Sequence, residues 1–543
     1  MQRPHGPAHG NYCALGTRHP GSPISRMPSP RRSVLFCLGL TLSLAVSTAS
    51  AAAASLQEKV RSWRVAQEST LIDEYRAFVA LPNVTIDRAG IQRNADFILA
   101  MMQRRGIDAR LLTVATPNAN PVVYGEVNVP GATRTLMLYA HFDGQPVNPA
   151  KWAPGWEPFN PKFATAPAEQ GGKLIESWKS GDRVDPSWRL TGRGSADDKA
   201  GVMALLNAYA GLTAAGAKPS VNLKFLFDGE EEIGSPRLAE LITQHRDRLR
   251  ADLWVILDGP SHPSGRKTVG FGVRGDVNLH LTVFGAKRPL HSGNYGNWAP
   301  NPAWALVRLL ATMKDDEGRV LIPGFYDDIA PLTPPEQRAL AAIPSIEEPL
   351  RRELGLARTE KPGRTLFEGF TLPTLNINGI FSADVGPQAA NIIPSIARAT
   401  LDLRLVLGND VQRQLGKVIA HIKAQGWHVL DRDPTDAERA EFPKLIRLDT
   451  KSAGNNAQRT PLEAPLPRAV AAAVQSTVDY PVVLMPTLGG TLPLIVIEQM
   501  LGTQLISVPI VNADNNQHAE NENVQVQFLW DGIETYAAIM TSL

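Results

Sequence analysis

Cysteine is almost absent from this sequence. The chain of 543 residues contains only Cys13 and Cys37, and both lie within the first 51 residues. The rest of the chain can therefore form no disulfide framework, use no thiol nucleophile and bind no metal through cysteine. Any metal ion held there must be bound by His, Asp and Glu side chains.

A strong charge of either sign is also lacking. The net charge is +2, and the first 51 residues hold five arginines and no acidic residue. Subtracting these arginines leaves −3 for the remaining chain, so a nucleic-acid partner loses its main electrostatic argument. With 43% hydrophobic and 20% charged residues, the composition excludes a disordered or fibrous protein. The length allows roughly three to four domains.

Only one short apolar run approaches a targeting or membrane segment. Residues 34–46 follow Arg31-Arg32 and precede the small residues Ala49-Ser50-Ala51. This order is typical of a secretory signal, and the run is short for a membrane span, although an N-terminal anchor is the alternative. We expect residues 1–51 to be a signal peptide, of the twin-arginine or the general type. The mature protein would be periplasmic or extracellular, with no stable membrane span.

Apolar strands alternate with amphipathic helices over the first part of the remaining chain. Residues 135–140 form a continuous apolar run, typical of a strand buried on both faces. Similar runs at 221–227 and 253–257 flank helical periodicity at 198–213 and 236–248. The alternation predicts the α/β class, with a mixed, largely parallel sheet and helices on both of its faces.

The pattern changes after residue 273. Residues 277–285 and 397–406 alternate apolar and polar side chains, and helices are predicted at 301–314 and 409–425. Half-buried strands with paired helices predict a smaller α+β domain that interrupts the α/β domain. The expected division is a leader at 1–51, an α/β domain formed by 52–273 and 454–543, and an inserted domain at 274–453.

Acidic and histidine clusters follow the predicted strands. In open α/β sheets, ligands bind at the carboxyl ends of the strands. The clusters are His141 with Asp143, Asp197-Asp198, Glu230-Glu231-Glu232, Asp258 and, far downstream, His518. Each cluster alone could be a helix cap, a turn or a solvated acidic tip. Jointly, carboxylates and imidazoles suit divalent cations, and such a set can hold two ions.

Five sequence blocks resemble one family, in that family's order. They are YAHFDGQPV (139–147), GRGSADDKAG (192–201), FDGEEEIGS (227–235), LDGP (257–260) and HAENE (518–522). With their flanking elements they cover nearly all of residues 57–543. The chain resembles the dizinc aminoacylase/carnosinase/carboxypeptidase G family of metallohydrolases, nearest its carnosinase-like dipeptidase branch.

The resemblance implies two Zn²⁺ per chain, with Co²⁺ or Mn²⁺ as alternatives. It implies that His141 binds one ion, Asp197 bridges both, Glu232 and Asp258 are terminal ligands, one on each ion, and His518 completes the second set. Glu231 would be the general base and then the general acid, and Asp143 would orient His141. Glu230 is expected at the surface or behind the ligands.

The inserted segment also matches, which implies a lid and a homodimer formed through this domain. His291, in RPLHSG (288–293), would reach the substrate carbonyl or oxyanion, often in the partner's site, unless it is a surface histidine. Asn391 and Arg404 would grip a substrate carboxylate, with a structural ion pair as the alternative for Arg404. The backbone of Gly489, Gly490 and Thr491 would bind the same carboxylate, or form a plain turn.

These expectations together describe an exported dizinc metallopeptidase that acts on short peptides, as a dipeptidase or a carboxypeptidase. A metal-bridging hydroxide would attack the scissile carbonyl while Glu231 transfers the proton. The main alternative is an N-acyl amino acid deacylase with the same metal site. A non-catalytic peptide-binding relative and a one-metal enzyme are further alternatives. Departures from the family at 164–186, at 294–298 and just before Gly489 bear on the substrate and not on the metals.

Overall fold

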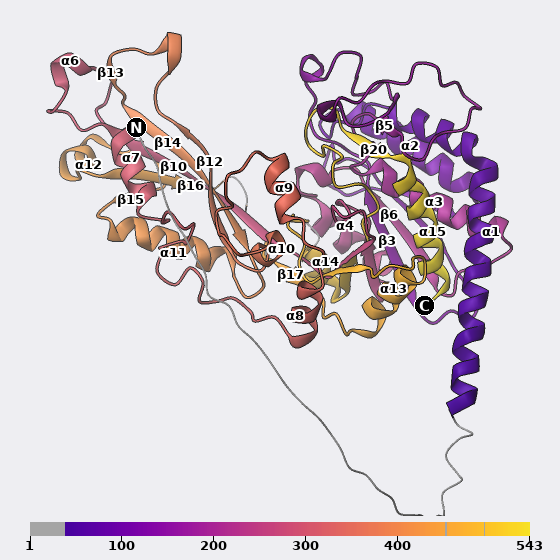
Figure 1. The fold of residues 1–543 in the computed structure, drawn as a ribbon. Coiled ribbons are helices and arrows are strands. Elements are labelled where there is room, and N and C mark those ends of the chain that lie inside the picture. Colours follow the sequence, from indigo (N-terminus) through magenta and orange to yellow (C-terminus); the bar gives the residue numbers. More distant parts are fainter. Residues whose placement is uncertain (1–38, 451–452, 493–494) are drawn as a thin grey trace, which may run out of the picture. The chain divides into compact units, whose positions relative to one another are not determined.

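The computed structural model describes residues 39–450, 453–492 and 495–543. Two β-sheets form the framework of the fold (Figure 1). Residues 52–543 form one compact unit. The larger sheet has eight strands in the order β1 (Asp108–Leu112), β2 (Val122–Val127), β6 (Asn222–Asp228), β3 (Thr135–His141), β7 (Leu253–Ile256), β19 (Gln504–Ser507), β8 (Thr268–Gly270) and β18 (Val483–Met485).

The centre of the larger sheet is parallel. Strand β3 pairs in parallel with β6 and β7, and β7 pairs in parallel with β19. Strands β1 and β2 add antiparallel pairs at one edge. The register places His141 opposite Asp228, so the carboxyl ends of the central strands lie at one edge of the sheet. The predicted mixed, largely parallel sheet is confirmed.

Helices cover both faces of this sheet, as predicted. Leu138 and Phe225 face a buried cluster formed with α1 (Gly39–Val79), α2 (Arg88–Arg104), α3 (Lys199–Ala214), α13 (Pro465–Gln475) and α15 (Val526–Thr541). Tyr139 and Trp254 point to the opposite face, where α4 (Leu238–Gln244) and α14 (Ile495–Leu501) pack. The continuous apolar runs in the central strands follow from this burial on both sides.

The smaller sheet has five strands, in the order β12 (Thr374–Phe381), β14 (Ile396–Leu405), β10 (Gly275–Phe284), β16 (Leu445–Asp449) and β15 (His428–Leu430). One face packs against α7 (Pro302–Ala311) and α11 (Val411–Ala424), in a cluster that contains Val277 and Leu401. Alternate residues of β10 are only partly buried. This alternation is the half-buried pattern predicted for the strand.

Several elements differ from the sequence-based expectations. Residues 145–190, expected to be loop, contain β4 (Phe163–Ala164) and β5 (Arg189–Thr191), which form a three-stranded sheet with β20 (Asn523–Gln525). The expected helix 236–248 breaks at His245 into α4 and α5 (Arg246–Leu249). Strands β12, β15 and β16, and helices α8 (Pro334–Ala341) and α9 (Glu347–Glu353), were not predicted. Most of these elements are short or mostly exposed, and such elements carry little hydrophobic periodicity.

Most of the expected leader lies outside the described residues. Residues 1–38, which include both cysteines, Arg31-Arg32 and the start of the apolar run, are not described. Helix α1 begins at Gly39. Among the residues that the structure describes, no helix combines the length and the apolarity needed to cross a bilayer.

Candidate metal centre

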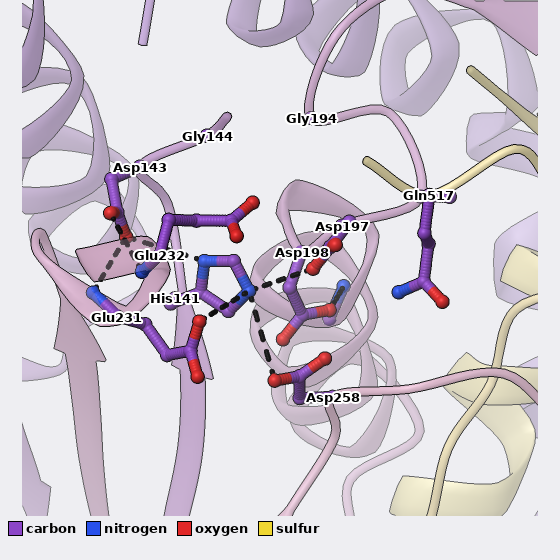
Figure 2. A network of polar contacts seen from close by, with 12 residues as sticks. His141, Asp143, Gly144, Gly194, Asp197, Asp198, Glu231, Glu232, Asp258 and Gln517 are labelled. Atoms are coloured by element: carbon purple, nitrogen blue, oxygen red, sulfur yellow. Dashed lines mark hydrogen bonds and ion pairs between the residues drawn. The ribbon is translucent and has the colours of Figure 1, made fainter. Parts of the chain in front are cut away.

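Four chain segments meet at the carboxyl edge of the larger sheet (Figure 2). His141 ends β3, and Asp258 follows β7. Glu231 and Glu232 lie in a short 3-10 helix after β6. Asp197 lies just before α3 and is joined to Asp198 by a cis peptide bond. Strand topology therefore brings together side chains that are far apart in the sequence.

His141, Asp197 and Asp258 form the first group of possible metal ligands. Nε2 of His141 lies 2.8 Å from Oδ1 of Asp197 and 3.8 Å from Oδ2 of Asp258. All three residues are buried. The potential ligand atoms of the three residues lie within 4.8 Å of one another, and one imidazole with two carboxylates is a donor set that suits a divalent cation.

Asp197, Glu232 and His518 form the second group. Nε2 of His518 lies 3.2 Å from Oδ2 of Asp197 and 3.3 Å from Oε2 of Glu232. His518 is the exposed member, with 62% of its side chain accessible. Asp197 belongs to both groups, and its two oxygens face different imidazoles. This is the arrangement expected of a carboxylate that bridges two ions.

Electrostatics also favour a cation here. Burial, together with the charge of Asp197, raises the pKa of Glu232 to about 7 and that of Asp258 to about 6. The hydrogen bond to Asp197 raises the pKa of His518 to about 9. Several carboxylates crowded in a buried site are costly unless positive charge compensates them. The residues present therefore fit divalent metal ions in both groups.

Asp143 links His141 to the loop that carries the glutamates. Its Oδ1 lies 3.3 Å from Nδ1 of His141. Its two oxygens accept hydrogen bonds from the backbone N–H groups of Glu231 and Glu232, at 3.0 and 3.1 Å. The hydroxyl of Thr85 donates to the same carboxylate. This position lets Asp143 orient the His141 ring and hold both glutamates beside it.

Glu231 lies beside the first group but belongs to neither group of possible ligands. Its Oε2 is 4.0 Å from Nε2 of His141, and only 11% of its side chain is exposed. Burial raises the pKa of this carboxyl well above its ordinary value. A carboxylate so placed can accept a proton at the site and release it again. Its neighbour Glu230 is buried and pairs with Arg237, so of the two positions expected for Glu230 the surface one is wrong and the one behind the ligands stays open.

Glu522, which we did not predict as a site residue, holds the loop that carries Asp197. Its fully buried carboxylate accepts hydrogen bonds from the backbone N–H groups of Gly194, Ala196 and Asp197. It also pairs with Arg193 at 2.7 Å. Arg193 in turn donates to the carbonyl of Ala519, next to His518. The HAENE block contains Glu522, but the sequence does not reveal that this residue is buried.

The structure brings three of the predicted substrate-binding residues together. Nη1 of Arg404 donates to the hydroxyl of Thr491 at 3.1 Å, and its Nε lies 3.2 Å from Asp402. Arg274, which we did not predict, donates its backbone N–H to the carbonyl of Gly490. The Arg274 guanidinium is buried near Arg404, and both the burial and this second cation lower its pKa to about 10. Gly489 packs against the ring of Phe370.

His291 and Asn391 lie on a separate small ribbon. Strand β11 (Leu290–His291) pairs with β13 (Ile392–Ile393), and the carbonyl of Asn391 accepts a hydrogen bond from Ser292. Both residues are exposed. Within the described part of this one chain, neither residue forms a hydrogen bond or ion pair with a candidate metal ligand. Their predicted catalytic and binding roles stay predictions.

The fold and the site together define a metal-dependent hydrolase: a largely parallel α/β sheet whose carboxyl edge carries two histidine–carboxylate groups joined by one aspartate. Residues 137–542 match peptidase family M20/M25/M40, and the chain belongs to this family. The resemblance seen in the sequence is confirmed.

Curated relatives match most of the chain. The Cys-Gly metallodipeptidase dug1 of Schizosaccharomyces pombe is 25% identical over 487 residues, covering 86% of this chain and 94% of that protein. The Beta-Ala-His dipeptidase of Homo sapiens is 26% identical over 434 residues, covering 78% and 77%.

Solved structures share the fold. The M20 family metallo-carboxypeptidase Sso-CP2 from Sulfolobus solfataricus has a TM-score of 0.69 and 26% identity, covering 87% of this chain and 98% of that one. Human carnosine dipeptidase 1 has a TM-score of 0.69 at 22% identity, covering 90% and 99%.

Proposed function

We propose that the protein is an exported dipeptidase that binds two metal ions per chain, and that these ions are Zn²⁺. The observation that carries this proposal is the position of Asp197 between two ligand groups, with Glu231 beside them but in neither. Relatives over most of the chain are a Cys-Gly metallodipeptidase and a Beta-Ala-His dipeptidase, which supports dipeptides as the substrate class.

The two groups define how the ions would be held. His141 and Asp258 would bind one ion, Glu232 and His518 the other, and Asp197 would bind both. When bound, the ions would polarise the scissile carbonyl and acidify the attacking water. The donor set contains nitrogen and carboxylate oxygen without sulfur, so Co²⁺ and Mn²⁺ are alternatives to Zn²⁺.

The protein's own residues would move the protons. The Glu231 carboxylate would take a proton from the water that attacks the carbonyl carbon, as the new C–O bond forms. It would then give that proton to the amine nitrogen, as the C–N bond breaks. Asp143 would hold His141 and Glu231 in fixed positions relative to each other, because it contacts the His141 ring and the backbone N–H of Glu231.

The far end of the substrate would be held by its carboxylate. Arg404 and Thr491 are already linked by a hydrogen bond, and Gly490 is tied to Arg274. The guanidinium groups of Arg274 and Arg404 lie near each other. Within the described residues, Asp402 is the one carboxylate within 4 Å of Arg404, so net positive charge is left to bind an anionic group. The free terminal carboxylate of a dipeptide would supply that anionic group.

One experiment tests the function directly. Protein purified without chelator is analysed for metal and assayed on dipeptides, longer peptides, blocked dipeptide amides and N-acyl amino acids. About two metal ions per chain and cleavage of free dipeptides that is lost with chelator would support the proposal. Cleavage of N-acyl amino acids alone would replace it with the deacylase. Absence of activity with Zn²⁺, Mn²⁺ and Co²⁺ would refute it.

We also propose that the protein is a homodimer formed through the smaller sheet. Edge strand β12 exposes Ile377, Ile380 and Phe381, with 43%, 54% and 57% of each residue accessible. Exposed apolar side chains along a sheet edge are typical of a surface that another chain covers. Light scattering should give twice the chain mass, and Ile380→Lys with Phe381→Lys should give the monomer mass.

Export is proposed from the sequence of the leader. Residues 34–46 and the small residues at 49–51 have the order of a signal and its cleavage site. Amino-terminal sequencing of the protein recovered from an exporting host should begin near residue 52. A mature chain that keeps the leader in the cytoplasmic fraction would overturn this proposal.

A further inference from the structure

A cavity lies in the segment 314–375, and none of the residues that line it belongs to the metal centre or the predicted substrate-binding set. Its volume is about 300 Å³, at the lower end of the range for small-molecule pockets. Its walls come from α9, α10 (Leu366–Gly369), the start of β12 and residues 314–326. The peptidase reaction gives this cavity no role.

The surface that lines the cavity is mainly apolar. Six of the lining residues are leucines: Leu350, Leu354, Leu356, Leu366, Leu372 and Leu375. Leu354, Leu356 and Leu366 keep 59%, 45% and 41% of their surface accessible. Water in contact with a concave aliphatic surface is unfavourable, so an apolar ligand that displaces it would gain free energy.

The charged side chains of the lining are unbalanced. Four cations line the cavity against two carboxylates, Glu347 and Glu360. Glu360 is paired with Lys314, and Arg351 is held by Glu348 outside the lining. Glu347 accepts hydrogen bonds from backbone N–H groups, including that of Leu366. Both carboxylates of the lining therefore already have partners: Lys314 for Glu360 and backbone N–H groups for Glu347.

The two remaining cations are Lys361 and Arg364. Within the described residues, neither has a carboxylate oxygen within 4.0 Å. Nζ of Lys361 lies 5.9 Å from the ring centre of Tyr326, which also lines the cavity. The cavity thus combines an aliphatic wall with two cations that lack a counter-charge.

We propose that this cavity binds an aliphatic monocarboxylate of medium chain length. The hydrocarbon chain would lie against the leucines, and the carboxylate would face Lys361 and Arg364. An aliphatic chain alone would leave the cations uncompensated, and a small anion alone would leave the leucines in contact with water. The two features together select a ligand with both parts.

Octanoate is the probe, measured by isothermal titration calorimetry against the full mature protein. We expect one octanoate per chain, with at least tenfold weaker binding of acetate and of octan-1-ol. Acetate lacks the chain and octan-1-ol lacks the charge. The double variant Lys361→Gln/Arg364→Gln should lose about tenfold in affinity for octanoate and none for octan-1-ol. Arg358→Gln, a nearby arginine outside the lining, is the matched control and should bind as the wild type does.

A second variant tests the cavity itself. Gly369 lines the cavity, and a Cβ atom added there meets no heavy atom within 4 Å, so Gly369→Trp adds a large ring at the cavity wall without a clash at its Cβ. It should abolish octanoate binding while dipeptide hydrolysis and the melting temperature stay at wild-type values. If Gly369→Trp fails to fold, the double charge variant decides. The proposal is overturned if the wild type binds no octanoate, if octan-1-ol binds as tightly, or if folded Gly369→Trp binds octanoate normally.

Discussion

Asp197 presents its two carboxylate oxygens to two different histidines: Oδ1 lies 2.8 Å from Nε2 of His141, and Oδ2 lies 3.2 Å from Nε2 of His518. His141 ends a central strand and His518 lies in a loop near the end of the chain. One carboxylate therefore connects two ligand groups that come from distant parts of the sequence. If each group binds one ion, as we propose, Asp197 is the one residue on which both ions would depend.

Replacing Asp197 with Asn should remove both metal ions. The amide keeps the size of the side chain but supplies one neutral oxygen and one nitrogen donor, which cannot bridge two cations. After dialysis, elemental analysis should find far less than one ion per chain. Glu520→Gln, a change in the same loop as His518 at a residue whose ion-pair partner is Lys151 at 3.9 Å, should keep both ions. A variant Asp197→Asn that retains two ions would refute the bridging assignment.

Replacing Glu231 with Gln should leave the metal content intact and remove turnover. Glu231 belongs to neither ligand group, so its carboxylate is not needed to hold an ion. Loss of a general base lowers the rate by about 10²- to 10⁴-fold. The measurement is kcat on a dipeptide beside metal analysis of the same sample. Residual kcat within tenfold of the wild type would exclude Glu231 as the base.

The central sheet and several site residues follow from rules that act locally. The apolar run before His141 and the one before Asp258 predict buried parallel strands, and parallel strands end at one edge. The three glutamates after β6 come to the same edge for the same reason. These residues need little beyond strand order to meet.

Other parts of the site depend on contacts that the local sequence does not encode. His518 reaches Asp197 because Arg193 and Glu522 tie its loop to the segment before α3. An isolated arginine or glutamate in a sequence is usually a surface residue, so the burial of Glu522 and Arg274 becomes visible only once their partners are placed. Strand β12 was missed because its alternation is short: it ends at Gly379, where the pairing with β14 also shifts register.

Stability of the metal-free protein should depend on pH through Glu232. Burial raises the folded-state pKa of this carboxyl from 4.5 to about 7, so the folded state binds a proton that the unfolded state has already released. The contribution of Glu232 to the free energy of unfolding therefore falls as pH rises from 4.5 through 7. Metal-free Glu232→Gln should be more stable than the metal-free wild type at pH 8.

The two proteins should converge as the pH falls below 4.5, where Glu232 becomes protonated in both states. Urea unfolding at several pH values between 4.5 and 8 measures the difference. The control is Glu520→Gln, which should follow the wild type throughout. A difference that grows toward low pH would contradict the assigned direction of the shift.

Glu522 should affect metal affinity by fixing the position of Asp197. Its carboxylate accepts a hydrogen bond from the backbone N–H of Asp197 and pairs with the Arg193 side chain. In Glu522→Gln, an NH₂ group replaces one accepting oxygen and faces other donors. Loss of such supporting contacts weakens metal binding by about 10- to 100-fold. Competition with a metal chelator gives the affinity.

Asp514→Asn provides a matched control for this prediction. Arg189 in β5 and Asp514, in the loop that precedes His518, also form an ion pair. Two hydrogen bonds join them, from Nη1 to Oδ1 at 2.9 Å and from Nη2 to Oδ2 at 2.8 Å. Within the described residues, neither side chain forms a hydrogen bond or ion pair with a candidate metal ligand. If both variants weaken metal binding equally, Glu522 acts through loop stability alone and not through the position of Asp197.

His291 allows a test of whether two subunits share one site. It is exposed on the ribbon formed by β11 and β13, and it forms no hydrogen bond or ion pair with a candidate ligand of its own chain in the described residues. If His291 completes the partner's site, His291→Ala and Glu231→Gln homodimers should both be nearly inactive, with both metal ions retained.

A mixed dimer of these two variants then contains one site with a wild-type Glu231 and a wild-type His291 from the other subunit. Mixing the two variants under exchange conditions should restore up to about one quarter of wild-type activity, because half of the dimers are mixed and each has one complete site. If activity stays at the level of the separate variants although mass analysis shows exchanged subunits, His291 does not act across the dimer.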